Sequence, residues 1–337
     1  MRTGRILAGA FALIGSLAII GLEAGVTGAS FTASTTNPTN SLITLNVQPP
    51  ATQNAATSAA AGTVNLSWTA TPTAPNGHTI TYLVLRNGVQ IGTTAGLVYS
   101  DTPPADGTYS YTVQTKIAQG AGFFSSGNSA AQSGLSDRTA PTMSATCNGG
   151  ACTGWFNGSV TFVVSGADGA GAGMGTATTN VDAAGAITSA APRTITVSGQ
   201  NAAHSIVYSG ADALGNASGN TTQTVKIDLT NPNPPTGVTG ASGSWGGGAS
   251  FNVSWSAGSD ALSGVAGYTV HWTNAVSSCP TRNTTNYPNA ASVGAVTAYA
   301  VTTAVSSGND YCAYVTTTDN AGNQSAASNG SGLTQAR

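Results

Sequence analysis

A β-strand that runs into a polar turn recurs along this chain and restricts it to β-rich folds. The last copy occupies residues 311–323, where alternate side chains from Tyr311 onward share one face because strand side chains alternate with a period of two. Residues 319–323, Asp-Asn-Ala-Gly-Asn, then supply a turn, since these residue types tolerate left-handed backbone. A second copy occupies residues 204–216, and a looser one residues 109–115. Three copies predict three modules.

The composition favours strands and argues against several classes of function. Charged residues make up 6% of the 337 residues, against about 25% in an ordinary soluble protein. Ser, Thr, Asn and Gly must therefore supply the polar surface, and they suit short strands and turns better than helices. The net charge of −2 provides no basic surface, so nucleic acid is not an expected partner. The chain has no glutamate after Glu23, which removes one of the two usual carboxylates for acid–base chemistry.

The N-terminus has the features of a targeting segment. Arg2 and Arg5 precede the mostly apolar residues 6–22, and small residues follow up to Ala29. This order predicts a signal peptide cleaved after Ala29. An uncleaved N-terminal anchor is the alternative, because 17 apolar residues are the lower limit for a membrane span. Residues 25–33 resemble the leaders of bacterial biofilm-fibre and camelysin-like proteins, which implies export.

Four cysteines follow the leader, and export would allow them to form disulfides. Cys147 and Cys152 enclose a short loop, and Cys279 and Cys312 are the remaining pair. No Cys-x-x-Cys motif is present, so a metal site built on cysteines is disfavoured. The sequence predicts two disulfides, Cys147–Cys152 and Cys279–Cys312.

The first module contains three strand signals in a recognisable order. Residues 64–68 alternate with Val64, Leu66 and Trp68 on one face, and Asn87-Gly88 between apolar runs predicts a hairpin. A Tyr-x-Tyr-x-Val strand follows at residues 109–113. This series resembles the fibronectin type III domain over residues 45–135, which implies an antiparallel β-sandwich.

The third module repeats the design of the first. Residues 251–255 match residues 64–68, and residues 268–272 match residues 82–86. The intervening insertion at residues 277–296 carries Cys279. Alternation in the strand after Tyr311 points Cys312 away from the core, so the disulfide should attach this loop to the outer face of the sheet.

The second module begins and ends at a repeated Asp-x-Thr-x-Pro motif. Its two copies occupy residues 137–141 and 228–232, where proline interrupts strand pairing and Asp and Thr can hydrogen-bond the local backbone. The proline-rich residues 231–235 predict a stiff linker. The order Thr-Ala-Pro, Cys…Cys, Gly-Trp-aromatic-Asn and Asp-x-x-Gly-Asn resembles bacterial Ig-like domains that occur in tandem on surface proteins.

These observations predict an all-β protein of three tandem Ig-like or fibronectin type III-like antiparallel sandwiches after an N-terminal signal helix. The predicted boundaries are residues 1–29 for the signal peptide or anchor, 30–44 for a linker, 45–136 for a fibronectin-like domain, 137–230 for a bacterial Ig-like domain and 231–337 for a second fibronectin-like domain.

No catalytic residue is predicted. His78, His204 and His271 fall one to a module, so a Ser-His-Asp arrangement cannot assemble within a domain without a specific fold-back. His204 aligns with Tyr109 and Tyr311 and is expected to fill a structural position with a hydrogen-bonding tip. His271 is expected to face solvent or an adjacent strand.

Asp168, Asp212, Asp260 and Asp319 each introduce a turn that contains Gly or Asn. Calcium prefers six to eight oxygens with several carboxylates, whereas these aspartates are spread along the chain. Capping of Asx turns is the favoured interpretation, and calcium at the junctions between domains is the alternative. The sequence therefore predicts no metal and no cofactor.

Five tryptophans are candidates for a sugar-stacking surface. Trp68, Trp255 and Trp272 fit inward core positions by alternation. Trp245, in a glycine-rich segment, and Trp155 have less core support. These two are the predicted ligand-binding residues.

The predicted function is non-enzymatic. The sequence favours a secreted or cell-surface protein that serves adhesion, spacing or matrix assembly, with a surface or matrix protein or a polysaccharide as its partner. Only an uncleaved N-terminal segment would contact the membrane. The alternative is a carbohydrate-binding accessory protein for cell-wall or extracellular polysaccharide.

Overall fold

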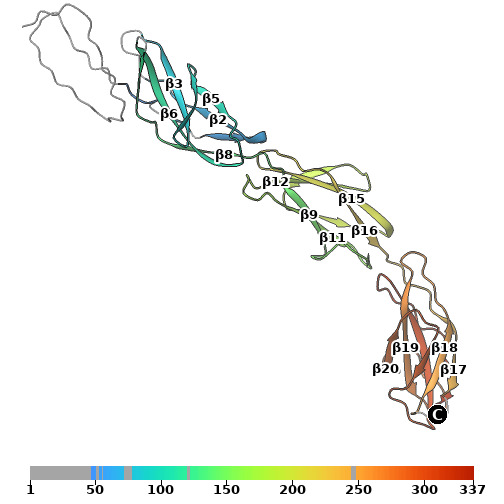
Figure 1. Cartoon of the computed structure of the whole chain (residues 1–337). Helices are drawn as coiled ribbons and strands as arrows, with labels where there is room; N and C mark the ends of the chain where they lie inside the picture. Colours follow the sequence, from blue (N-terminus) through green and yellow to red (C-terminus); the bar gives the residue numbers. More distant parts are fainter. Residues whose placement is uncertain (1–46, 51–52, 55, 72–77, 120–121, 244–247) are drawn as a thin grey trace, which may run out of the picture.

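The computed structural model describes residues 47–50, 53–54, 56–71, 78–119, 122–243 and 248–337. These residues form three β-sandwiches that follow one another end to end (Figure 1), which confirms the predicted all-β fold. In this part of the chain, no helix has both the length and the apolar character needed to span a membrane. The predicted leader, residues 1–29, and the predicted linker, residues 30–44, lie outside the described residues.

The first domain packs a three-stranded sheet, in the order β1-β2-β5, against a sheet in which β4, β3, β6 and β7 are neighbours and β8 also pairs with β6. The Asn87-Gly88 turn joins β3 to β4 with positive φ angles of 50° and 79°, as the hairpin prediction requires. The elements are β1 (Thr57–Ala59), the 3₁₀ helix η1 (Ala60–Gly62), β2 (Thr63–Ser67), β3 (Ile80–Arg86), β4 (Val89–Thr94), β5 (Val98–Asp101), β6 (Gly107–Gln119), β7 (Gly122–Ser125) and β8 (Gln132–Ser136).

The second domain contains the sheets β14-β11-β9 and β10-β16-β15-β12-β13. Only the short pairing of β10 with β16 is parallel among the pairings of this domain. Its strands are β9 (Thr142–Cys147), β10 (Trp155–Phe156), β11 (Val160–Ala167), β12 (Met174–Val181), β13 (Ile187–Ala190), β14 (Arg193–Val197), β15 (Asn201–Asp212) and β16 (Thr221–Ile227).

The third domain repeats the arrangement with the sheets β17-β18-β21 and β20-β19-β22-β23. Its strands are β17 (Thr236–Ser242), β18 (Phe251–Ser256), β19 (Val265–Asn274), β20 (Asn289–Val293), β21 (Ala298–Val301), β22 (Asp310–Asp319) and β23 (Thr334–Gln335).

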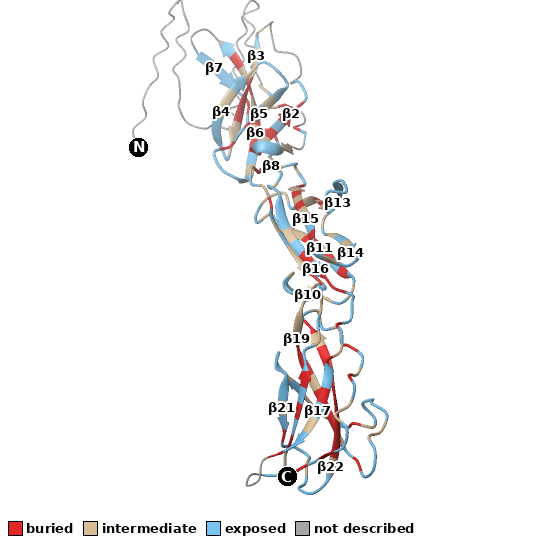
Figure 2. Ribbon diagram, turned by 90° about the vertical axis from the view of Figure 1, so that its right-hand side faces the viewer, coloured by how far each residue is buried: buried red, intermediate tan, exposed pale blue. Residues whose placement is uncertain are grey.

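Each domain has its own hydrophobic core between its two sheets, seen as buried stripes along the inner strands (Figure 2). Trp68 and Trp255 are 3% and 5% exposed, so the prediction that they are core residues is confirmed. Their rings pack edge-on against Tyr82 and Tyr268 with the same centroid distance of 5.4 Å and the same interplanar angle of 63°. This identical pair supports the interpretation that the first and third domains share one design.

Serines at every third position secure one edge of the third domain. Ser325, Ser328 and Ser331 each donate a backbone N–H to a carbonyl of β22, while their hydroxyl oxygens accept the N–H of that same β22 residue. A period of three fits an extended segment of polyproline type, which has no internal hydrogen bonds. Ser126 and Ser129 pair with β6 in the same way. The predictions made from the sequence did not include this Ser-x-x-Ser signal.

A small second core lies outside the main core of the third domain. Cys312 is on the face of β22 opposite Tyr311 and Ala313, as predicted, but it is fully buried. It packs with Ala275, Tyr287 and Tyr314 beneath the inserted loop. The Cys279–Cys312 disulfide therefore holds the loop against the outer face, and the loop in turn shields the sheet.

We predict that Ser328→Ala lowers the free energy of unfolding of the third domain by about 1–3 kcal/mol, because the buried N–H of Val315 loses its 2.9 Å hydrogen bond to the hydroxyl. Chemical denaturation, with hydrogen exchange of the Val315 amide, measures the effect. Ser254→Ala is the matched control, since its hydroxyl bonds Thr239 on an exposed face. Equal losses in both variants would contradict a special role for the buried serine.

Candidate functional site

The first junction contains no free spacer between domains. Strand β8 ends at Ser136, and the next residue, Asp137, is fully buried. The Ser136 hydroxyl donates to the carbonyl of Gly62, and the N–H of Gly62 donates to the carbonyl of Asp137. A Cβ at Gly62 would lie 2.7 Å from the Arg138 side chain, so glycine permits this close approach.

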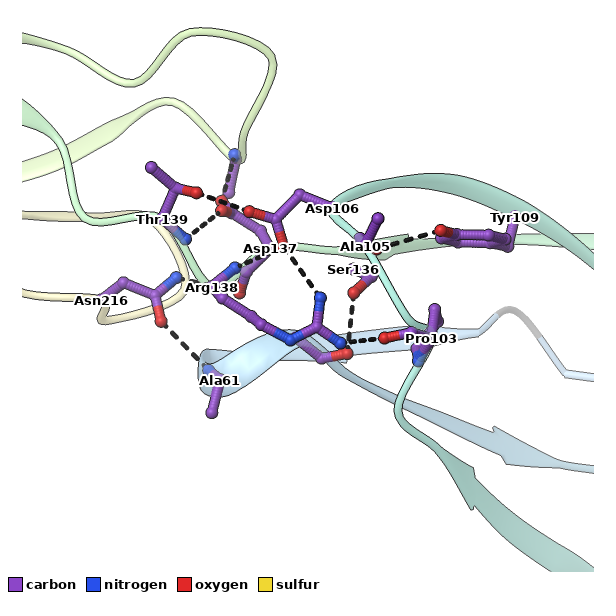
Figure 3. Close-up of polar contacts among 12 residues, drawn as sticks. Ala61, Pro103, Ala105, Asp106, Tyr109, Ser136, Asp137, Arg138, Thr139 and Asn216 are labelled. Atoms are coloured by element: carbon purple, nitrogen blue, oxygen red, sulfur yellow. Dashed lines mark hydrogen bonds and ion pairs between the residues drawn. The ribbon is translucent and has the colours of Figure 1, made fainter.

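Arg138 and Thr139 reach back to the first domain (Figure 3). The Arg138 guanidinium donates to the Pro103 carbonyl and forms an ion pair with Asp106 at 3.1 Å. The Thr139 hydroxyl donates to the other Asp106 oxygen at 2.5 Å. The Thr139 hydroxyl, together with the Arg138 amide and guanidinium, lowers the pKa of Asp106.

Asn216 of the second domain also contacts the first junction, although it lies 79 residues after Asp137 in the sequence (Figure 3). It lies in the turn after β15. Its side-chain oxygen accepts the N–H of Ala61 at 3.0 Å, and its amide nitrogen donates to the Asp137 carbonyl at 3.1 Å and to Asp212 at 2.6 Å. One asparagine thus connects two domains and the aspartate of its own turn.

Three aspartates meet at this junction although they are far apart in the sequence. Asp137, Asp168 and Asp212 each contribute a carboxylate oxygen, and these oxygens lie within 4.8 Å of one another. Asp137 accepts the N–H groups of Thr139 and Ala172. Asp168 accepts the N–H of Gly173 with one oxygen at 2.7 Å. We name Asp137, Asp168 and Asp212 the first aspartate cluster.

The hydrogen bonds of Asp212 favour its charged form. Burial by itself would raise the pKa, but the side chain and backbone of Asn216 and the N–H of Leu214 outweigh it and lower the pKa of Asp212. The carboxylate therefore stays ionised in a site where it is only 4% exposed.

The second junction repeats this arrangement with Asp228, Asp260 and Asp319, which we name the second aspartate cluster. Asp228 is fully buried and accepts the N–H groups of Thr230 and Ser263. Asn323 donates to the Asp228 carbonyl at 2.9 Å, as Asn216 does to Asp137. The repeated Asp-x-Thr-x-Pro motif therefore marks equivalent positions in both junctions.

The Asx-turn interpretation is confirmed for three of the four predicted aspartates. Asp212, Asp260 and Asp319 each accept the N–H of the residue two positions later. The accompanying premise was wrong, however. These aspartates do not remain spread out, because the turns that they cap all lie at the end of a domain that faces its predecessor. Because these aspartates are far apart in the sequence, the sequence alone did not predict that they lie close together.

The second domain also has an open groove of about 500 Å³ between the edges of its two sheets. Residues of β12, β13, β14 and β15 and the adjoining turns line it, including Arg193, Asp182 and His204. Arg193 donates to the hydroxyls of Thr179 and Ser189. Two of the guanidinium N–H groups of Arg193 are therefore already bonded to residues of β12 and β13.

His204 has the structural position that the sequence predicts. It is 7% exposed, and its Nδ1 and Nε2 lie 2.7 Å from an Asp182 oxygen and 3.0 Å from the Gly199 carbonyl. Both partners are acceptors, so the doubly protonated ring satisfies both contacts. Burial would lower the pKa of His204, but the Gly199 carbonyl and the Asp182 carboxylate outweigh it and raise the pKa. Such a ring has no free nitrogen to act as a base.

The remaining predicted residues differ in their surroundings. His271 stacks on Tyr314 of the adjacent strand with centroids 4.5 Å apart, and burial lowers its pKa.

Trp272 is 3% exposed and belongs to the core, as predicted. Trp155 lies on the edge strand β10, half-buried, with the Lys226 ammonium 5.7 Å from its ring centroid. Trp245 lies outside the described residues.

Both predicted disulfides are present. Cys147–Cys152 joins the end of β9 to the following loop, and Cys279–Cys312 holds the inserted loop of the third domain. The structure describes no free cysteine. These bonds are consistent with an oxidising, extracellular location.

Comparison with known proteins leaves the function open. No family model and no curated protein matches the chain. Among solved structures, it is similar to the chicken CNTN1 FN1-FN3 domains, with 15% identity and a TM-score of 0.40 over 86% of this chain and 99% of that one. It is also similar to the central fibronectin-III array of RIM-binding protein, with 14% identity and a TM-score of 0.22 over 84% and 97% of the two chains. Both likenesses concern the fold alone.

The His204–Asp182 pair should make the second domain less stable at high pH. The pKa of His204 is raised in the folded state, so its contribution to stability is complete below the unfolded pKa, about 6.5, and disappears as the pH rises through the folded pKa. Hydrogen exchange of the β15 amides as a function of pH, corrected for intrinsic exchange, measures this loss.

Asp182→Asn is the matched variant for that measurement, since it removes the charge and retains the size. It should flatten the pH profile near neutrality. An unchanged profile would show that the pair does not control the stability of β15.

Proposed function

We propose that this protein is a non-catalytic, extracellular or cell-surface spacer of adhesion type, in which tandem sandwiches hold a binding surface away from the point of attachment. The observation that supports this most directly is the hydrogen-bonded first junction. Arg138, Thr139 and Asn216 all bond residues of the preceding domain. Such contacts restrict bending, whereas a free linker would not.

The two disulfides support an oxidising compartment, and the predicted leader is in keeping with export. The low charge and the many Ser, Thr and Asn residues give an uncharged polar surface, which suits a spacer that must avoid non-specific electrostatic binding. Determination of the mature N-terminus and of the cell fraction that contains it tests the location.

Absence of catalysis is part of the proposal. In the described residues, His204 has both ring nitrogens bonded to acceptors, and His271 stacks on Tyr314 beneath the inserted loop. Neither arrangement provides the base that a serine nucleophile needs. Turnover of a glycan or peptide by the pure protein would contradict the proposal.

The stiffness of the first junction is tested with spin labels at two exposed positions, Val89→Cys in the first domain and Ile187→Cys in the second. Double electron–electron resonance should give a narrow distance distribution in the parent chain. Arg138→Ala should broaden it, because it removes the bonds to Pro103 and the ion pair with Asp106.

Lys116→Ala is the control, since it removes one positive charge from the first domain and leaves the junction contacts in place. Its distribution should match that of the parent. A parent distribution that is already broad and that Arg138→Ala leaves unchanged would contradict a stiff spacer.

Carbohydrate binding is the second candidate function, and the half-buried ring of Trp155 on an edge strand favours it. A partly exposed indole can stack on a sugar ring, whereas the core tryptophans cannot. We expect Trp155→Ala to abolish binding on a panel of cell-wall and extracellular polysaccharides if this function holds. Phe123→Ala, at a 54% exposed aromatic of the first domain, is the control. Equal binding by both variants would contradict the role of Trp155.

A further inference from the structure

We propose that the groove of the second domain binds the C-terminal end of an extended polypeptide, which adds as a strand to the open edge of β14 and places its terminal carboxylate on Arg193. The groove has a volume of about 500 Å³ and lies at the side of the sandwich. In the described part of the chain, β13 pairs only with β12 and β14 only with β11, so both strands are edges. This inference rests on the proposed adhesion function and supplies the binding surface that such a spacer carries.

Arg193 is a positive charge without a carboxylate partner. Its Nε and Nη1 atoms donate to the hydroxyls of Thr179 and Ser189, at 2.8 and 3.0 Å. These neutral acceptors hold the guanidinium in place without compensating its charge, and no ion pair among the described residues includes it. A guanidinium has five N–H groups in a planar fork, so other donors remain for a ligand. A carboxylate matches that fork with two parallel hydrogen bonds.

The other charged side chains that line the groove compensate each other. Nδ1 of His204 lies 2.7 Å from Asp182, and Nε2 lies 3.0 Å from the carbonyl of Gly199, just beyond the end of β14. The doubly protonated ring therefore balances the carboxylate. Arg193, the first residue of β14, gives the groove its net positive charge. A ligand with one negative charge at the start of β14 is complementary to this arrangement.

The backbone of β14 directs hydrogen-bonding groups to its open side. Thr161 of β11 bonds Asn148 through both its N–H and its C=O, so its backbone points away from β14. Thr196 lies opposite Thr161, and opposite residues of an antiparallel pair point their backbone groups either toward each other or both away. The N–H and C=O of Thr196, and by alternation those of Thr194, therefore face the open edge. An added strand would bond these groups.

The side chains of the groove favour a polypeptide over a sugar. Val181, Ile187 and Ile195 form aliphatic walls, and Ile187 is 60% exposed. The described lining residues include no Trp, Tyr or Phe, so a sugar ring would have no indole or phenyl face on which to stack. A strand directs every second side chain to one face, and aliphatic side chains of the added strand would cover Ile187.

The connection between β13 and β14 determines which end of the polypeptide binds. β13 ends at Ala190 and β14 begins at Arg193, so residues 191–192 alone join the two sheets and close the groove at that end. Antiparallel pairing is the more stable arrangement of two strands. A strand antiparallel to β14 runs toward the closed end and must stop there. Its terminal carboxylate then meets the guanidinium of Arg193.

The test uses the synthetic peptide acetyl-Lys-Thr-Val-Thr-Val with a free C-terminus, which matches the five residues of β14. It is titrated into the isotope-labelled full chain and followed by NMR. The amide signals of Thr194 and Thr196 should shift, and these amides should exchange more slowly with solvent in the bound state. The same peptide with a C-terminal amide should bind about tenfold more weakly, because it lacks the charge that pairs with the guanidinium.

Arg193→Gln should weaken binding of the free-carboxylate peptide by about tenfold and leave the affinity for the amidated peptide nearly unchanged, because only the first peptide has a charge to lose a partner. Lys226→Gln is the matched control. It removes the same charge from the same domain, at a residue that lies beside Trp155 and does not line the groove. This variant should bind both peptides as the parent does.

Absence of shifts in β14, equal affinity for the two peptides, or equal binding by Arg193→Gln and the parent would each overturn the proposal. Shifts at the groove with an oligomer of glucuronic acid but not with the peptide would also overturn it, since the ligand would then be an acidic saccharide. Peptide binding is measured independently of chain stiffness, so this test and that of the spacer function can fail separately.

Discussion

The junctions of this protein depend on an aspartate that closes the turn after a central strand and on an asparagine four residues later. Asp212 accepts the N–H groups of Leu214 and Asn216, and Asp319 accepts those of Ala321 and Asn323. Each asparagine then donates its amide to the carbonyl of the aspartate that directly follows the last strand of the preceding domain, Asp137 or Asp228. The turn after β15 or β22 is thus hydrogen-bonded to the segment through which the chain enters the same domain. Because that entry residue directly follows the last strand of the preceding domain, a local turn also determines how two domains meet.

Sequence patterns with a short period were enough to predict the fold. Alternation placed Val64, Leu66 and Trp68 in the core, and all three are at most 3% exposed. The same rule placed Cys312 on the face opposite the core of the third domain. These predictions succeed because strand geometry fixes the direction of each side chain from its position alone. The Asn87-Gly88 hairpin was equally predictable, since few other residue pairs adopt two successive positive φ angles.

The candidate sites were harder to predict because they combine residues that no period connects. No short-period pattern brings Asp168 beside Asp137, since their proximity depends on which loops gather at one end of a sandwich. His204 likewise meets Asp182 through the pairing of β12 with β15. The burial of Cys312 beneath the inserted loop follows from Tyr287, which the alternation of β22 cannot place. The serine repeat was different, because Ser325, Ser328 and Ser331 show a period of three that was readable in advance.

A chain with so few charges makes each one informative. The pairs Arg86–Asp101, Arg138–Asp106 and His204–Asp182 each join segments that are separate in the sequence. None of these pairs includes an aspartate of either cluster, so the negative charge of the two clusters is stabilised by oriented N–H groups and not by basic side chains. Backbone N–H groups act only while their turns keep one conformation. The stability of the junctions is therefore coupled to the conformation of these turns. Both junctions share this coupling, although their other contacts differ.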